Sequence, residues 1–165
     1  MRFWVAVLVG AVALPVMAQG TLAGRSVTLN VLTYDDPANP VMDSRGRTVT
    51  VGAAVEFGMG PEFRKPGFDV VPVQVQIGPD RIAFSYGSDR GTFMAAAFNG
   101  YVLRFQTECA LFAAWQVDLA ATTMAVTDQD IHAPGGALFI NVAGRDFGPD
   151  AWLVVDLRIA DCPMS

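Results

Sequence analysis

Apolar and polar residues alternate with a period of two along most of the chain after residue 24, and this pattern is typical of half-buried β-strands. In residues 26–33, for example, Val27, Leu29 and Val31 share one face, while polar side chains occupy the other. Nine segments follow the pattern. It predicts strands over residues 26–33, 47–57, 70–77, 81–86, 93–97, 101–107, 111–119, 137–142 and 152–160.

Glycine, proline and asparagine separate these segments and indicate the turns. Gly78-Pro79-Asp80 joins two alternating segments and predicts a hairpin. Asn99-Gly100 is suited to the positive φ of a tight turn. No stretch has the periodicity and caps of a long amphipathic helix. Eight or nine short strands in a chain of this size predict an all-β fold, an antiparallel β-sandwich of the jelly-roll-like or immunoglobulin-like kind.

The N-terminus has the pattern of a secretory signal peptide. Arg2 precedes an apolar run over residues 3–14, and small residues precede a cleavage position after Ala18. The apolar run is too short to cross ~30 Å of hydrocarbon as a helix. The sequence therefore predicts a signal peptide over residues 1–18, a single domain over 19–165, and export to the periplasm or the extracellular space.

Composition narrows the range of partners. The 165-residue chain is 52% hydrophobic and 16% charged, with a formal net charge of −5. Such a chain folds rather than stays disordered. It contains one lysine, Lys65, and no basic stripe, which argues against nucleic acid and against an anionic membrane surface. No apolar run after the signal peptide is long enough to span a bilayer, so no transmembrane anchor is predicted.

Cys109 and Cys162 are the two cysteines of the chain. An even number of cysteines in an exported protein predicts a disulfide. Closing this loop would stabilise the fold by about 4 kcal/mol in the chain-entropy model. The alternative is a pair of buried free thiols.

Two acidic segments are candidate metal sites. Asp128, Asp130 and His132 are spaced at i, i+2 and i+4, so on a strand they would share one face and could hold a divalent metal. Asp35 and Asp36, with Asp43 nearby, make the long loop over residues 34–45 acidic and could bind calcium through oxygen atoms. The alternative for both segments is a solvated loop with no metal, and the sequence predicts no resident cofactor.

The last predicted strand carries the best candidate binding residues. Trp152 falls on the polar register of this strand, together with Asp156 and Arg158. An exposed indole beside hydrogen-bonding groups can stack on a sugar ring. The alternative is burial of Trp152 under a loop. Trp115 falls in register with Val117 and is predicted to lie in the core.

Catalysis has weaker support in the sequence. A glycosidase needs two carboxylates across a cleft, and Glu56, Asp69, Asp118 and Asp156 are candidates because they adjoin apolar runs. No Gly-x-Ser-x-Gly motif supports a serine hydrolase. We therefore predict no catalytic residues.

Four short motifs follow one another along the chain: Val-Gly-x-x-Val-Glu-Phe at 51–57, Phe-Asn-Gly-Tyr-Val at 98–102, Ile-Asn-Val-Ala-Gly at 140–144 and Leu-Val-Val-Asp-Leu at 153–157. Together they resemble the exported β-sandwich domain of bacterial PEP-CTERM proteins, the substrates of exosortase sorting. The resemblance implies a sandwich at or outside the cell surface, with no catalytic residues to carry over. The tail departs from the family, because the chain ends at Ser165 without a Val-Pro-Glu-Pro signal, so sorting and anchoring are not carried over.

Together these observations favour an exported, non-catalytic binding module. Its expected ligand is a glycan or another envelope protein, bound through Trp152 and the long loops over residues 34–45 and 58–68. One alternative is a structural component that self-associates through sheet edges. Another is a hydrolase that acts on envelope polysaccharide. The oligomeric state stays open.

We expect the intact mass of the protein purified from a secreting host to match residues 19–165, less the two hydrogens lost in a disulfide. A mature chain that begins elsewhere would contradict the predicted cleavage after Ala18. Thiols that react with an alkylating reagent under denaturing, non-reducing conditions would contradict the disulfide.

Overall fold

The computed structural model describes residues 20–44, 46–58, 71–106 and 110–161. Twelve strands form in these residues, with two short 3₁₀ turns. No helix in the described ranges is long and apolar enough to cross a membrane. The strands are β1 (Ser26–Tyr34), β2 (Met42–Asp43), β3 (Arg47–Thr50), β4 (Val73–Ile77), β5 (Arg81–Tyr86), β6 (Gly91–Thr92), β7 (Phe98–Phe105), β8 (Ala110–Val117), β9 (Ile131–His132), β10 (Ala137–Asn141), β11 (Asp146–Phe147) and β12 (Trp152–Asp161).

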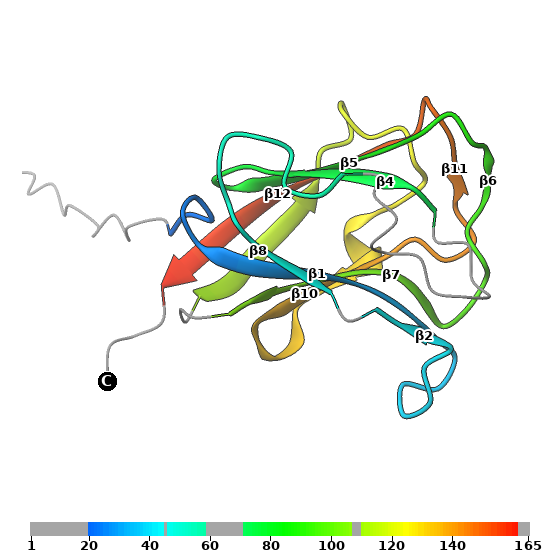
Figure 1. The fold of residues 1–165 in the computed structure, drawn as a ribbon, viewed down its shortest axis with the longest axis horizontal. Helices are drawn as coiled ribbons and strands as arrows, with labels where there is room; N and C mark the ends of the chain where they lie inside the picture. The colour runs from blue at the N-terminus through cyan, green and yellow to red at the C-terminus, as the bar shows by residue number, and fades with distance from the viewer. Residues whose placement is uncertain (1–19, 45, 59–70, 107–109, 162–165) are drawn as a thin grey trace, which may run out of the picture.

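The strands form an antiparallel β-sandwich, as the alternation predicts. One layer is a four-stranded sheet in the order β4-β5-β12-β8. The other is a six-stranded sheet in the order β2-β1-β7-β10-β9, with β3 also paired to β1. Figure 1 shows the two layers, with the small β11–β6 ribbon at one end of the sandwich.

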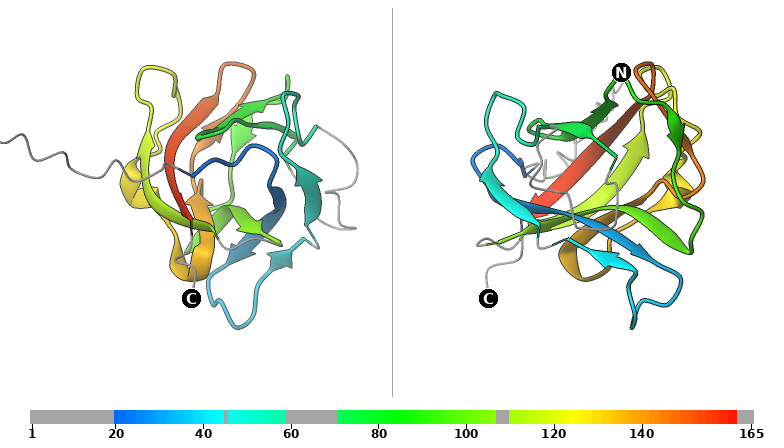
Figure 2. Two further views of the ribbon diagram at one scale, coloured as in Figure 1. Left: turned by 90° about the vertical axis from the view of Figure 1, so that its left-hand side faces the viewer. Right: turned by 45° about the vertical axis from the view of Figure 1, so that its right-hand side comes forward.

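The core lies between the inner faces of the two sheets, around which the strands wrap in the views of Figure 2. Strand β12 shows the alternation most clearly. Leu153, Val155, Leu157 and Ile159 are all buried, whereas Trp152 on the other register is exposed. Val155 sits opposite one residue of β5 and one residue of β8, so β12 contributes to the core from the middle of its sheet.

Most of the predicted strands form, β5 with the predicted bounds and the others with shifted ends, and two predictions fail. The hairpin of β4 and β5 is confirmed, with strand β5 over the predicted residues. The strand predicted over residues 47–57 ends at Thr50, because the side chain of Glu56 turns inward and bonds to backbone groups. The strand predicted over 93–97 is wrong. Side chains bond this segment instead: Asp35 accepts from the Ala97 N–H.

Asn99-Gly100 does not form the predicted tight turn. Both residues lie inside β7, which starts earlier than the alternation predicts, and Gly100 has no positive φ. A glycine is required for a different reason: a Cβ at position 100 would lie 2.0 Å from the carbonyl oxygen of Ile140 on β10. The backbones of β7 and β10 approach each other too closely for any side chain.

Cys109 and Cys162 lie outside the described residues, so their disulfide stays a prediction. Their sequence neighbours Ala110 and Asp161 are Cα partners at the end of the β8–β12 ladder.

We expect Gly100→Ala to lower the free energy of unfolding by about 3 kcal/mol, because the new methyl group forces two central strands apart. Gly52→Ala is the control, since a Cβ at position 52 meets nothing within 4 Å. Urea unfolding measures both variants. Equal stability of the two variants would contradict the close approach of β7 and β10.

Candidate functional site

The outer face of the four-stranded sheet brings together the side chains that the alternation placed on its polar register. Trp152 on β12 is 45% exposed. Its Cα partner is Ser85 on β5, and the partner of Ser85 is Gln74 on β4. Because directly opposed residues of an antiparallel sheet point to the same face, these three side chains form one row across three strands.

A second polar row lies further along the same face. Asp156 on β12 has Arg81 on β5 and Gln116 on β8 as its Cα partners. Arg158 follows two residues later and is exposed. Asp156 lies four residue steps along the strand from Trp152, which corresponds to ~14 Å. We call the side chains of these two rows, together with Arg158 and the small Ala83 that lies between the rows, the outer-face platform.

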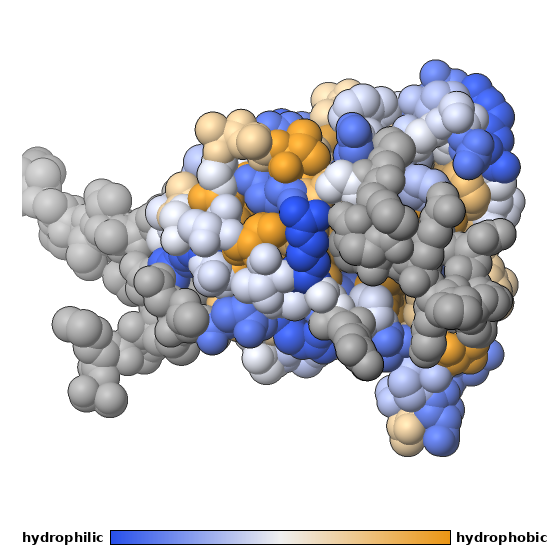
Figure 3. Space-filling model, in the orientation of Figure 1, coloured by the Kyte–Doolittle hydropathy of each residue, from blue (hydrophilic) through white to orange (hydrophobic). Residues whose placement is uncertain are grey.

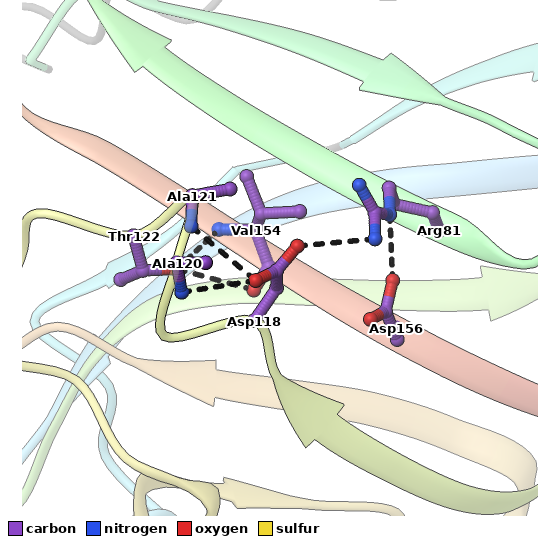
Figure 4. Close-up of polar contacts among 7 residues, drawn as sticks. All are labelled: Arg81, Asp118, Ala120, Ala121, Thr122, Val154 and Asp156. Atoms are coloured by element: carbon purple, nitrogen blue, oxygen red, sulfur yellow. Dashed lines mark hydrogen bonds and ion pairs between the residues drawn. The ribbon is translucent and has the colours of Figure 1, made fainter.

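Arg81 connects two carboxylates on this platform (Figure 4). Its Nε donates to Asp156 at 2.6 Å and one terminal nitrogen donates to Asp118 at 3.1 Å. The hydrogen bond to Asp156, with the negative charges of Asp156, Asp118 and Asp80, raises the pKa of Arg81. All three side chains remain partly exposed. The network therefore fixes the positions of charged groups that solvent can still reach.

The loop after β8 fixes the start of β12. Asp118 accepts the backbone N–H groups of Ala120 and Ala121 (Figure 4), which turns the chain. Thr122 then exchanges hydrogen bonds with the backbone of Val154, and the Thr123 hydroxyl accepts from the Trp152 N–H at 2.9 Å. Trp152 is thus held by β5 on one side and by this loop on the other, so its backbone is anchored before any ligand arrives.

Asp128, Asp130 and His132 do not come together as the metal hypothesis requires. Residues 128–130 form a 3₁₀ turn rather than an extended strand, so the three side chains do not share a face. Asp128 accepts the Val117 N–H at 2.6 Å, and Asp130 pairs with Arg145. In the described part of the chain, no group of three or more His, Cys, Asp and Glu side chains could hold a metal ion.

His132 belongs to an aromatic cluster that the sequence analysis missed. Its ring stacks on Phe139 with centroids 4.9 Å apart, and Phe98 lies edge-on to both rings. Tyr34 stacks on the other side of Phe98. The cluster covers the outer face of the six-stranded sheet. Register could have indicated it, because Phe98 is the Cα partner of Tyr34 and Phe139 is the partner of His132.

Asp35 and Asp36 are occupied by hydrogen bonds within the protein. Asp36 accepts from the Ala38 N–H and from Asn39, and these two bonds, the first above all, lower its pKa. Asp35 accepts from Ala97 at 2.8 Å. The loop projects from the sandwich as a hydrophilic tip, visible at the lower right of Figure 3. Both carboxylates therefore stabilise the conformation of the loop.

The carboxylate of Glu56 has a structural role. Glu56 is buried, with 8% of its surface exposed, and its carboxylate accepts the N–H of Ile77 at 2.8 Å and the N–H of Gly52 at 3.0 Å. It therefore satisfies an N–H at the outer edge of β4, and Asp128 does the same for Val117 on β8. Among the other glycosidase candidates, Asp118 and Asp156 share Arg81, while Asp69 lies outside the described residues.

A pocket of about 500 Å³ opens elsewhere, at the end of the sandwich that carries the β11–β6 ribbon. Thr33 and Tyr101 of the six-stranded sheet line it, with Phe93 and Phe147 beside the β11–β6 ribbon. Trp115, which the sequence placed in the core, is partly buried against the core and does not line this pocket. The pocket and the outer-face platform are separate surfaces.

The fold defines this chain as an antiparallel β-sandwich. Comparison with protein-family models, curated proteins and solved structures finds no match. The resemblance to the PEP-CTERM sandwich stays a prediction, and a proposal about function rests on the geometry of this chain.

We expect Glu56→Ala to lower the free energy of unfolding by about 1–3 kcal/mol, because it leaves the Ile77 and Gly52 N–H groups without an acceptor. Glu56→Gln should cost less, since its amide oxygen can still accept. The control is Asp150→Asn, in an ion pair whose carboxylate is 84% exposed, and its effect should stay within about 0.5 kcal/mol. The midpoints of urea unfolding, compared at an unchanged slope of the free energy against urea concentration, measure all three variants. A Glu56→Ala midpoint equal to that of the control would rule out a stabilising role of Glu56 at the edge of β4.

Proposed function

We propose that this protein is an exported, non-catalytic binding module and that a glycan binds to its outer-face platform. The observation that carries the proposal is the exposed indole of Trp152 at one end of a row of hydrogen-bonding side chains. A flat aromatic face suits the C–H surface of a sugar ring. The neighbouring amide, hydroxyl and charged groups suit its hydroxyl groups.

The dimensions of the platform favour an oligosaccharide over a single sugar. Trp152 and the Arg81–Asp156 pair are ~14 Å apart along the sheet, so a ligand that touches both spans several units. The amides of Gln74 and Gln76 on β4 are exposed along one side. Neutral amides together with both signs of charge favour a polar, largely neutral chain rather than a polyanion.

Rigidity supports a binding role for this face. The backbone of Trp152 bonds to Thr123, and Arg81 is fixed between two carboxylates. Groups that are fixed before binding lose less conformational entropy when a ligand arrives. The platform can therefore hold a weakly interacting polar ligand without rearrangement.

The competing functions have less support in the described residues. Self-association through the four-stranded sheet needs open strand edges, and carboxylates of Glu56 and Asp128 occupy edge N–H groups on β4 and β8. A hydrolase needs a carboxylate pair across a cleft, whereas Asp118 and Asp156 are joined through one guanidinium.

Tryptophan fluorescence tests the proposal. Once the predicted signal peptide is removed, Trp115 and Trp152 are the remaining tryptophans, so Trp115→Phe leaves Trp152 as the sole reporter. We expect envelope oligosaccharides to shift its emission, and Trp152→Ala to weaken binding measured by calorimetry about tenfold or more. Monosaccharides should bind far more weakly.

Val55→Ala is the matched control, because Val55 is a similarly exposed apolar residue, 49% against 45%, outside the platform. It should bind like the parent. If Trp152→Ala binds the same oligosaccharide as tightly as Val55→Ala, the platform is not the site. If none of the neutral envelope oligosaccharides tested binds the parent protein, the glycan proposal is wrong.

A further inference from the structure

We infer that the pocket beside the β11–β6 ribbon is a second binding site, and that it takes a small apolar molecule with a cationic group. Apolar and aromatic side chains supply most of its described lining. A pocket of about 500 Å³ is within the ordinary range for small-molecule sites. It is independent of the glycan platform, because neither Trp152 nor Arg81 lines it.

The rim of the pocket leaves apolar surface in contact with water. Large hydrophobic residues are exposed at only a few described positions, and two of them, Val41 and Met94, line this pocket. Met94 is about half exposed, and methionine is a flexible side chain that adapts to ligands of varied shape. Covering both side chains would remove apolar area from water, which favours an apolar ligand.

The polar groups of the wall are already paired. The Thr33 hydroxyl donates to the Asn99 side chain at 2.9 Å, and the Asn99 amide nitrogen donates to the Met94 carbonyl. The Tyr101 hydroxyl donates to Tyr86. A ligand that entered with many hydroxyl groups would lose hydrogen bonds to water without replacing them. The wall therefore selects against sugars and for hydrocarbon.

The described lining of the pocket carries charge of one sign only. Asp89 is exposed and lines the pocket, whereas no lysine, arginine or histidine appears in its described lining. The ring centroids of Phe93 and Phe147 lie 5.0 Å apart. The faces of aromatic rings attract cations. A carboxylate beside aromatic rings favours an ammonium group and disfavours a carboxylate ligand.

Three probes with the same hydrocarbon chain separate the contribution of ligand charge from that of apolar burial. They are decyltrimethylammonium, decanol and decanoate, each used below its critical micelle concentration. We expect calorimetry on the intact exported protein to rank their affinities in that order, with decanoate weakest. Asp89→Asn should weaken decyltrimethylammonium about fivefold and leave decanol unchanged, because an exposed charge contributes modestly. Met94→Ala should weaken decyltrimethylammonium and decanol alike.

Asp150→Asn is the control, because it removes another exposed carboxylate, one that does not line the pocket. Trp152→Ala should also leave all three affinities unchanged. No binding of decyltrimethylammonium would overturn the inference, as would decanoate binding at least as tightly. Binding that neither Asp89→Asn nor Met94→Ala weakens would place the probe at another surface and overturn the site.

Discussion

The alternation of side chains along β12 is the constraint on which both the core and the proposed binding face depend. Leu153, Val155 and Leu157 are almost completely buried against the opposite sheet, and Trp152 and Arg158 remain on the other face. Because the period is two, a shift of the register by one residue would exchange the two faces. Burial of the apolar side chains therefore fixes the register of β12. The register in turn determines which polar residues lie on the outer face.

The same structure shows how carboxylates stabilise the backbone of a sandwich. Glu56 and Asp128 each accept a backbone N–H at an edge of the four-stranded sheet, and Asp118 closes the turn that anchors Trp152. An unsatisfied buried N–H costs about 1–3 kcal/mol, so these positions are explained by folding. Arg81 and Asp156, whose side chains are nearly half exposed, are available to a ligand.

Local alternation was enough to predict the all-β class, the β4–β5 hairpin and the outward direction of Trp152. It could not predict β2, β6, β9 and β11, because strands of two residues have no period to detect. It also predicted the wrong role for Gly100. A glycine is required there because the carbonyl oxygen of Ile140, forty residues later, leaves no room for a side chain. Asp128 and His132 looked like metal ligands only under the assumption of an extended chain. The pocket is lined by segments that lie far apart in the sequence, which no local pattern contains.

Chemical-shift mapping by nuclear magnetic resonance would test the central claim, that the outer face of the four-stranded sheet binds a glycan. The ¹⁵N-labelled exported protein would be titrated with a neutral envelope oligosaccharide. Our account predicts shifts of the Trp152 indole N–H and of amides near Gln74, Ser85 and Asp156, with the pocket residues Phe93 and Tyr101 unchanged. Shifts confined to the pocket, to the 35–41 loop or to the aromatic cluster around Phe98 would contradict it.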